Sequence, residues 1–183
     1  MPEKDHKSVF IITGETGSGK TTFLLKLIEE LRGEALSLAG FAALSVPEGG
    51  PSGSYNILDL VSGKILPLAS RRFTGGWEQY GKFYFNPAGI LMGKNILEDP
   101  MIIKNDLVVL DEIGPFELDG KIWAQSLARL LAGQSCSILL VVREQLVNQV
   151  IQQWSIKDAV VIDFGQLKPG QAASMILSQI RGI

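Results

Sequence analysis

A glycine-rich turn near the start of the chain has the residue types and spacing that hold the phosphates of a nucleotide. Its pattern is G-x-x-x-x-G-K-T, formed by Gly14, Glu15, Thr16, Gly17, Ser18, Gly19, Lys20, Thr21 and Thr22. Glycines let the backbone approach a phosphate closely, and successive N–H groups at a helix N-terminus then form a nest for an anion. Lys20 is expected to bridge the β- and γ-phosphates, and the Thr21 hydroxyl to bind Mg²⁺. We therefore predict that Gly14 to Thr22 bind a nucleoside triphosphate.

An acidic pair, Asp111-Glu112, follows an apolar run about 90 residues after this turn. The apolar run predicts a buried strand that carries both carboxylates to the C-terminal edge of a parallel sheet, where open α/β folds bind ligands. Asp111 would then hold Mg²⁺ opposite Thr21, and Glu112 would polarise a water in line with the γ-phosphate. The alternative is an acidic pair that only ends a strand. We favour metal ligation by Thr21 and Asp111, with Glu112 and Lys20 as catalytic residues.

Three arginines are candidates for neutralising the charge that develops on the γ-phosphate. Arg143 follows the apolar run 139–142, so it should emerge at the same sheet edge as Asp111. We predict Arg143 to be the catalytic arginine; otherwise it is a surface residue that opens the next helix. Arg71 and Arg72 lie near glycines and could act as mobile fingers or belong to a solvated loop. Lys168 is a weaker candidate for contact with the base.

Hydrolysis is not the only function that such a loop supports. The residues from Asp111 to Gly114 match D-x-x-G of GTPase switches, but the chain has no N-K-x-D tetrapeptide for reading guanine. A small-molecule or nucleotide kinase would use the same loop and place an acceptor over the central part of the chain. A nucleotide-gated binding module is a third class. The leading prediction is an Mg²⁺-dependent nucleoside triphosphatase that converts ATP, GTP or other triphosphates to the diphosphate and phosphate.

Composition limits the class of protein. The 183 residues suit one domain, and 46% hydrophobic with 20% charged residues are ordinary values for a globular chain. A net charge of −2 gives no reason to expect nucleic acid or an anionic membrane as a partner. The single cysteine, Cys136, lies in an apolar run and is expected to be buried, and the single histidine, His6, cannot form a metal cluster alone. No apolar run is long enough to span a membrane and the first residues lack a signal sequence, so we expect a cytoplasmic protein.

Periodicity predicts strands that alternate with helices, and therefore a mostly parallel sheet flanked by helices. A hairpin with Pro67 on an edge strand is expected inside an antiparallel insertion at about 47–85. Gly33 is expected to cap the first helix, and Asn86 with Pro87 to open a later one. The expected strands are 8–13, 38–46, 55–61, 65–68, 81–85, 106–111, 137–142 and 159–162, and the expected helices are 23–32, 86–98, 121–131, 144–154 and 171–180.

The insertion is rich in aromatic residues, namely Phe73, Trp77, Tyr80, Phe83, Tyr84 and Phe85. We interpret them mainly as the packing of an antiparallel layer. The alternative is a surface for a protein partner or for a substrate other than the nucleotide.

The run from Asp111 to Leu118, D-E-I-G-P-F-E-L, resembles the D-E-I-G-x-x-E motif of the thermophilic and cancer-related nucleoside triphosphatases. The phosphate loop and four dipeptides between the two motifs fit the same family; these are Gly40-Phe41, Leu58-Asp59, Ser62-Gly63 and Leu68-Ala69. The resemblance covers essentially the whole chain and implies a P-loop NTPase with a RecA-like core, Mg²⁺-dependent hydrolysis and loose base preference. By position it assigns phosphate and Mg²⁺ to Lys20 and Thr21, the metal to Asp111 and the water to Glu112.

The chain departs from that family at two places. The segment after Phe41 lacks the arginines that relatives often carry there. Near the C-terminus, Asp163-Phe164-Gly165 replaces a frequent Asn-Arg pair. These departures affect the residues that would stabilise the transition state and recognise the base.

Overall fold

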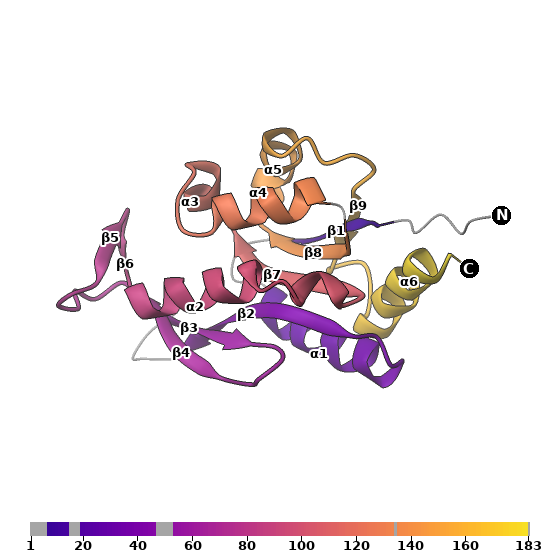
Figure 1. Ribbon diagram of the computed structural model, residues 1–183, viewed down its shortest axis with the longest axis horizontal. Helices are drawn as coiled ribbons and strands as arrows, with labels where there is room; N and C mark the ends of the chain where they lie inside the picture. Colours follow the sequence, from indigo (N-terminus) through magenta and orange to yellow (C-terminus); the bar gives the residue numbers. More distant parts are fainter. Residues whose placement is uncertain (1–6, 15–18, 47–52, 134, 183) are drawn as a thin grey trace.

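The computed structural model describes residues 7–14, 19–46, 53–133 and 135–182. One mixed sheet of nine strands runs through the molecule, and helices cover both of its faces (Figure 1). The strand order is β5-β6-β4-β3-β2-β7-β8-β1-β9.

The parallel part of the sheet contains β2 (Leu38–Val46), β7 (Leu107–Ile113), β8 (Ser137–Val142), β1 (Val9–Thr13) and β9 (Val160–Asp163). Strand β8 lies between β1, which leads into the phosphate loop, and β7, which carries the acidic pair. The strands β7, β8 and β1 thus end at the same edge of the sheet. This arrangement confirms the predicted P-loop α/β fold with a mostly parallel sheet.

The antiparallel part extends this sheet through β3 (Ser54–Asp59), β4 (Ile65–Ser70), β6 (Phe83–Phe85) and β5 (Glu78–Tyr80). The hairpin predicted here is present, and β3 pairs directly with β2. The prediction that Pro67 lies on an edge strand is wrong, because β4 has β6 on its other side. However, β6 pairs only with Ala69 and Ser70, so Pro67 is not required to donate a ladder hydrogen bond there.

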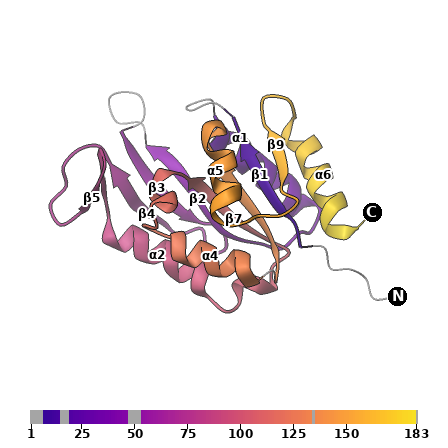
Figure 2. The same cartoon turned by 90° about the horizontal axis from the view of Figure 1, so that it is seen from above.

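Each face of the sheet has its own helices, because side chains alternate along the strands. Phe10 and Ile12 of β1 pack with α1 (Lys20–Gly33) and α6 (Pro169–Arg181), whereas Ile11 belongs to the opposite core. That opposite face is covered by α2 (Pro87–Glu98), α4 (Ala124–Gly133) and α5 (Val147–Gln153). Helices α2 and α4 lie side by side on it (Figures 1 and 2).

Several element boundaries differ from the sequence-based expectations. Helix α1 begins at Lys20 and includes Gly33, and its C-cap is Glu34. The helix expected at 121–131 runs from Ala124 to Gly133, and the one expected at 144–154 divides into η2 (Glu144–Leu146) and α5. Two short helices were not expected, η1 (Ile102–Lys104) and α3 (Pro115–Leu118). Asn86 caps α2 as predicted, accepting a hydrogen bond from the Ala88 N–H, and Cys136 is buried.

None of the helices in the described ranges has the length and apolar character of a membrane span.

Candidate active site

The phosphate loop connects the end of β1 to the start of α1. Gly19 is the N-cap of α1 with φ of 98°, a backbone conformation that favours glycine. Residues Glu15, Thr16, Gly17 and Ser18 of the predicted loop lie outside the described residues. Lys20 is buried, and its Nζ donates a hydrogen bond to the Gly14 carbonyl at 3.0 Å. Burial lowers the pKa of Lys20, whereas the negative charge of Glu112 raises it. Nearby anions therefore favour the charged form of the Lys20 side chain.

Phe164, the residue after β9, lies against Gly14 at the start of this loop. A Cβ at Gly14 would lie 2.1 Å from its ring, and the ring also packs on Phe23 of α1 at 5.7 Å between centroids. Phe164 belongs to the run Asp163-Phe164-Gly165, and no pattern in the sequence indicated its close approach to Gly14. Lys168, the weaker candidate for base contact, is exposed at the N-cap of α6.

Thr21 and Asp111 meet as predicted, although they are far apart in the sequence. The Thr21 hydroxyl donates to Asp111 Oδ2 at 3.1 Å, and the Ala43 backbone N–H donates to the same oxygen at 3.1 Å. Asp111 is fully buried, and within the described part of the chain its second oxygen, Oδ1, has no hydrogen-bond partner. A buried carboxylate oxygen without a partner is costly unless a cation or donor reaches it.

These contacts fit a magnesium site that the nucleotide completes. Burial, and to a smaller extent the charge of Glu112, raises the pKa of Asp111 to about 7, so the carboxylate gains from a nearby cation. The described residues contain no group of three or more histidine, cysteine or carboxylate side chains placed to form an all-protein cage. Mg²⁺ is commonly held by one or two carboxylates together with substrate phosphates and waters. Thr21 and Asp111 would therefore be its protein ligands.

Glu112 owes its position to a β-bulge. In the pairing of β7 with β8, Leu110 opposes Leu140 and Ile113 opposes Val142, so Asp111 and Glu112 together face one residue of β8. Glu112 has φ of 62°, which costs a non-glycine residue on the order of 1–3 kcal/mol and is typical of functional sites. The bulge separates the two carboxylates: Asp111 turns to Thr21, whereas Glu112 faces Arg143.

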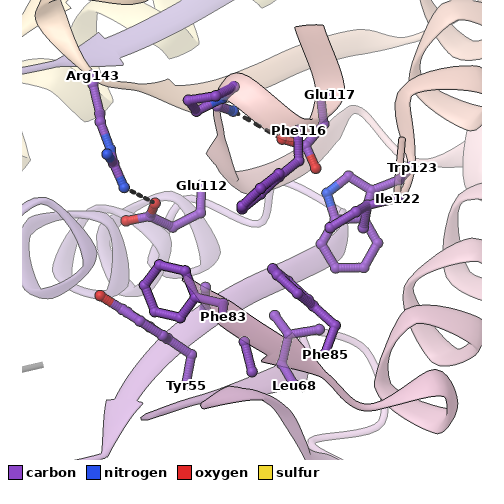
Figure 3. Close-up of a pocket in the computed structure, with 14 residues that line it drawn as sticks. Tyr55, Leu68, Phe83, Phe85, Glu112, Phe116, Glu117, Ile122, Trp123 and Arg143 are labelled. Carbon is purple, nitrogen blue, oxygen red and sulfur yellow. Dashed lines mark hydrogen bonds and ion pairs between the residues drawn. The ribbon is translucent and has the colours of Figure 1, made fainter. Parts of the chain in front are cut away.

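Of the three candidate arginines, Arg143 is the one that lies next to Glu112. Its Nη2 is 3.7 Å from Glu112 Oε2, and both side chains are about one-third exposed, at 34% and 37% (Figure 3). Arg71 instead lies over the Phe83 ring, with Cζ 5.4 Å from the centroid, and Arg72 is exposed on the same loop. The geometry therefore favours Arg143 as the arginine that acts at the reacting phosphate, which stays a prediction.

We expect Arg143→Ala to lower turnover about tenfold or more with little change in nucleotide affinity, because an arginine that stabilises the transition state contributes mainly to kcat. Steady-state phosphate release and equilibrium binding of a non-hydrolysable triphosphate measure the two effects. Arg129→Ala is the matched control, because Arg129 forms only a surface ion pair with Glu98. Unchanged turnover in Arg143→Ala would show that Arg143 does not act at the reacting phosphate.

Glu117 is a site residue to which the sequence analysis gave no role. Its carboxylate accepts a hydrogen bond from the Gly114 N–H at 2.9 Å and thereby fixes the turn that follows Glu112. It is almost fully buried, and burial raises its pKa to about 8. The pattern D-E-I-G-x-x-E contains this glutamate, but only the structure shows that it positions the turn.

Both raised pKa values predict that the nucleotide-free protein loses stability as pH increases. Between the unfolded-state pKa of each acid and its folded-state value, about 7 for Asp111 and about 8 for Glu117, the folded chain binds more protons than the unfolded chain. Unfolding free energy should therefore fall as pH rises, by up to about 1.4 kcal/mol per pH unit for each group. Urea unfolding at pH 5 to 9 measures this slope. The decrease of unfolding free energy with pH should be smaller in Glu117→Gln than in the wild type. The same slope in both proteins would contradict the raised pKa of Glu117.

An apolar pocket lies beside Glu112 and Arg143 (Figure 3). Its walls come from the antiparallel strands, from α3 and from the segment before α4, and include Tyr55, Leu68, Phe83, Phe85, Phe116 and Trp123. The predicted packing of the aromatic residues is present: Phe85 contacts Phe83, Tyr80 and Phe116. Phe73 is an exception, since it is 76% exposed.

Comparison with known proteins agrees with this geometry. The family model described as NTPase matches residues 9–166. Among curated relatives, the nucleoside-triphosphatase THEP1 of Methanothermobacter thermautotrophicus is 30% identical over 140 residues, which are 74% of this chain and 77% of the relative. THEP1 of Pyrobaculum aerophilum is 33% identical over 120 residues, which are 66% of this chain and 65% of the relative. The matched stretch thus spans slightly under two thirds of the Pyrobaculum protein.

Solved structures show the same fold over nearly the whole chain. A human cancer-related nucleoside triphosphatase superposes with a TM-score of 0.70 at 22% identity, covering 96% of this chain and 98% of that one. THEP1 from Aquifex aeolicus gives a TM-score of 0.69 at 25% identity, covering 94% and 98%.

The fold and the site thus define a P-loop enzyme of the nucleoside-triphosphatase class. Within that class, the chain belongs to the NTPase family that includes the THEP1 proteins. The resemblance carried by the phosphate loop and the D-E-I-G-x-x-E motif is confirmed.

Proposed function

We propose that this protein is an Mg²⁺-dependent nucleoside triphosphatase that hydrolyses ATP, GTP and other triphosphates to the diphosphate and phosphate in the cytoplasm. The observation that carries the proposal is the 3.1 Å hydrogen bond from the Thr21 hydroxyl to Asp111 Oδ2, which supports metal binding by this pair next to buried Lys20. Relatives named nucleoside-triphosphatase support the same activity.

The phosphate-binding residues act by position and charge. Lys20, at the N-terminus of α1, contacts the β- and γ-phosphates, and Thr21 with Asp111 holds the metal on the side of β7. When bound, Mg²⁺ neutralises the charge that develops on the phosphate oxygens. The unpaired Asp111 Oδ1 and the raised pKa of Asp111 support this assignment.

Glu112 is the residue that selects water as the nucleophile. Its carboxylate stands one residue beyond the metal ligand and accepts a proton or hydrogen bond from a water aligned with the γ-phosphorus. The ion pair with Arg143 holds both side chains at the same edge of the sheet. Arg143 then contributes positive charge to the γ-phosphoryl oxygens as the bond to the β-phosphate breaks.

Phosphate release without an added acceptor tests this function. The protein is incubated with ATP, GTP, CTP or UTP, with Mg²⁺ or with an excess of EDTA. We expect phosphate from several triphosphates with Mg²⁺ and none with EDTA. If no free phosphate appeared, and the nucleoside diphosphate formed only when an alcohol or nucleotide acceptor was added, the phosphoryl group would have passed to the acceptor; the protein would then be a kinase and the proposal would be wrong.

A further inference from the structure

The aromatic residues of the insertion divide between the two faces of its antiparallel strands. Side chains alternate along a strand, so Phe83 and Phe85 of β6 point to one face and Tyr84 points to the other. Phe85 belongs to a hydrophobic core, and Phe83 packs against that core. Phe73, Trp77 and Tyr84 belong to neither of the two cores formed by the described residues. Core packing therefore accounts for only some of the aromatic residues in the insertion.

Phe73 is an exposed ring that the fold holds in a defined orientation. Its side chain is 76% exposed, and its ring stands at 90° to the ring of Tyr84 with 5.4 Å between centroids. The loop before it is fixed to β4, because the Arg72 N–H donates a hydrogen bond to Ser70 Oγ at 3.0 Å. A ring held in this way loses little conformational freedom when another flat group packs on it.

Basic side chains accompany the rings that lie outside the cores. Arg71 and Arg72 directly precede Phe73, Lys82 is two residues before Tyr84, and all three basic side chains are exposed. The stretch between Asp59 and Glu98 contains five basic residues and one acidic residue; these are Lys64, Arg71, Arg72, Lys82, Lys94 and Glu78. The net charge of −2 for the whole chain conceals this excess, because the rest of the chain is acidic.

We propose that the surface formed by Arg71, Arg72, Phe73, Trp77, Lys82 and Tyr84 binds single-stranded nucleic acid. Bases stack on the exposed rings, and the arginine and lysine side chains hold the phosphates. An acidic protein segment would use the basic side chains but not a ring open to solvent, whereas a nucleic acid strand uses both. Strands β5 and β6 stand at one end of the molecule, where a long chain has access (Figure 1). This binding is separate from triphosphate hydrolysis and does not depend on it.

Fluorescence anisotropy of a labelled oligothymidylate of about 12 nucleotides, without a terminal phosphate and at low salt, tests the proposal. We expect a Kd of about 10 µM or tighter for the wild type. Phe73→Ala should weaken binding about fivefold or more, because one base loses its stacking partner. Phe73→Leu should weaken binding to a similar extent, since leucine keeps an apolar side chain but has no ring face. Phe73 is largely exposed, so we expect both variants to fold.

The dependence of affinity on salt tests the phosphate contacts. Removing Arg72 and Lys82 together, as Arg72→Ala with Lys82→Ala, should lower the slope of log affinity against log salt concentration by about 1.4, which corresponds to two contacts with a single strand. Arg129→Ala is the matched control, because it removes an exposed arginine from α4 that pairs with Glu98. Its slope should equal that of the wild type.

Two competitors distinguish a nucleic acid surface from other sites. An abasic oligomer of the same length should compete poorly, whereas equal competition would indicate a general polyanion site and overturn the proposal. A saturating non-hydrolysable triphosphate should leave oligothymidylate affinity unchanged; displacement of the oligomer would place it in the phosphate loop instead. Absence of binding at about 100 µM protein, or equal affinities of the wild type and Phe73→Ala, would also overturn the proposal. Because hydrolysis is not measured in these assays, they do not depend on the proposed function.

Discussion

Replacing Asp111 with asparagine is expected to abolish Mg²⁺-dependent phosphate release and to raise the melting temperature of the nucleotide-free protein. Both effects follow from one feature, a fully buried carboxylate whose pKa is raised to about 7 by burial and by Glu112. Without a bound cation, its negative charge lowers the unfolding free energy of the protein at pH 8. With triphosphate present, we propose that the same charge holds the metal.

The amide of Asp111→Asn keeps the local contacts while removing the charge. Its carbonyl oxygen can still accept from the Ala43 N–H and the Thr21 hydroxyl, which both now bond Oδ2. We expect the unfolding free energy at pH 8 to rise by about 1–3 kcal/mol, as is common when a functional charge is removed from a buried site. Phosphate release should fall by about a thousandfold or more, because metal stabilisation of the transition state amounts to several kcal/mol.

Thermal unfolding at pH 8 and phosphate release with saturating Mg²⁺ and ATP measure the two effects of Asp111→Asn. Asp119→Asn is the matched control, since Asp119 is exposed and pairs only with Lys121, and it should change neither quantity appreciably. If the Asp111→Asn variant were stabilised but still hydrolysed ATP at the wild-type rate, Asp111 would not be a ligand of the metal.

Glu112→Gln is expected to lower turnover by about 10²–10⁴, the usual contribution of a positioned acid–base group, while triphosphate affinity changes by less than about threefold. Glutamine has nearly the same shape, so it should keep the bulged backbone in which Glu112 has φ of 62°. It loses the charge that pairs with Arg143 at 3.7 Å and that accepts a proton from water. Loss of rate with retained binding identifies an interaction made in the transition state.

Single-turnover phosphate release and titration with a non-hydrolysable triphosphate separate the two effects of Glu112→Gln. Glu144→Gln is a suitable control, because Glu144 is exposed two residues along the chain from the end of β8. Normal turnover in Glu112→Gln would show that another group positions the water.

The sequence predicted the parts of the fold and site that depend on local signals. Strands Leu38–Val46 and Ser137–Val142 match their expected bounds because each is a continuous apolar run, and the cap at Asn86 follows from the Asn-Pro pair. The meeting of Thr21 with Asp111 was predictable as well, since a phosphate loop and an acidic strand end must share one sheet edge.

The remaining features depend on contacts between distant segments. The bulge at Glu112 arises from the pairing of β7 with β8, and the burial of Glu117 from the chain folding back on Gly114. Likewise, the position of Arg71 over Phe83 instead of the phosphate loop depends on where β6 lies. Among the described residues the Trp123 indole nitrogen has no hydrogen-bond acceptor, which is a property of the assembled core and has no signature in the neighbouring sequence.

We propose that Glu112 directs water onto the γ-phosphorus of a triphosphate held by Lys20, Thr21 and Asp111. Hydrolysis of ATP with Mg²⁺ in ¹⁸O-labelled water, followed by mass spectrometry of both products, tests it most directly. We predict that the phosphate gains one ¹⁸O from water while ADP stays unlabelled, and that Glu112→Gln releases this labelled phosphate far more slowly. Label in ADP, or release of unlabelled phosphate, would contradict attack by water at the γ-phosphorus.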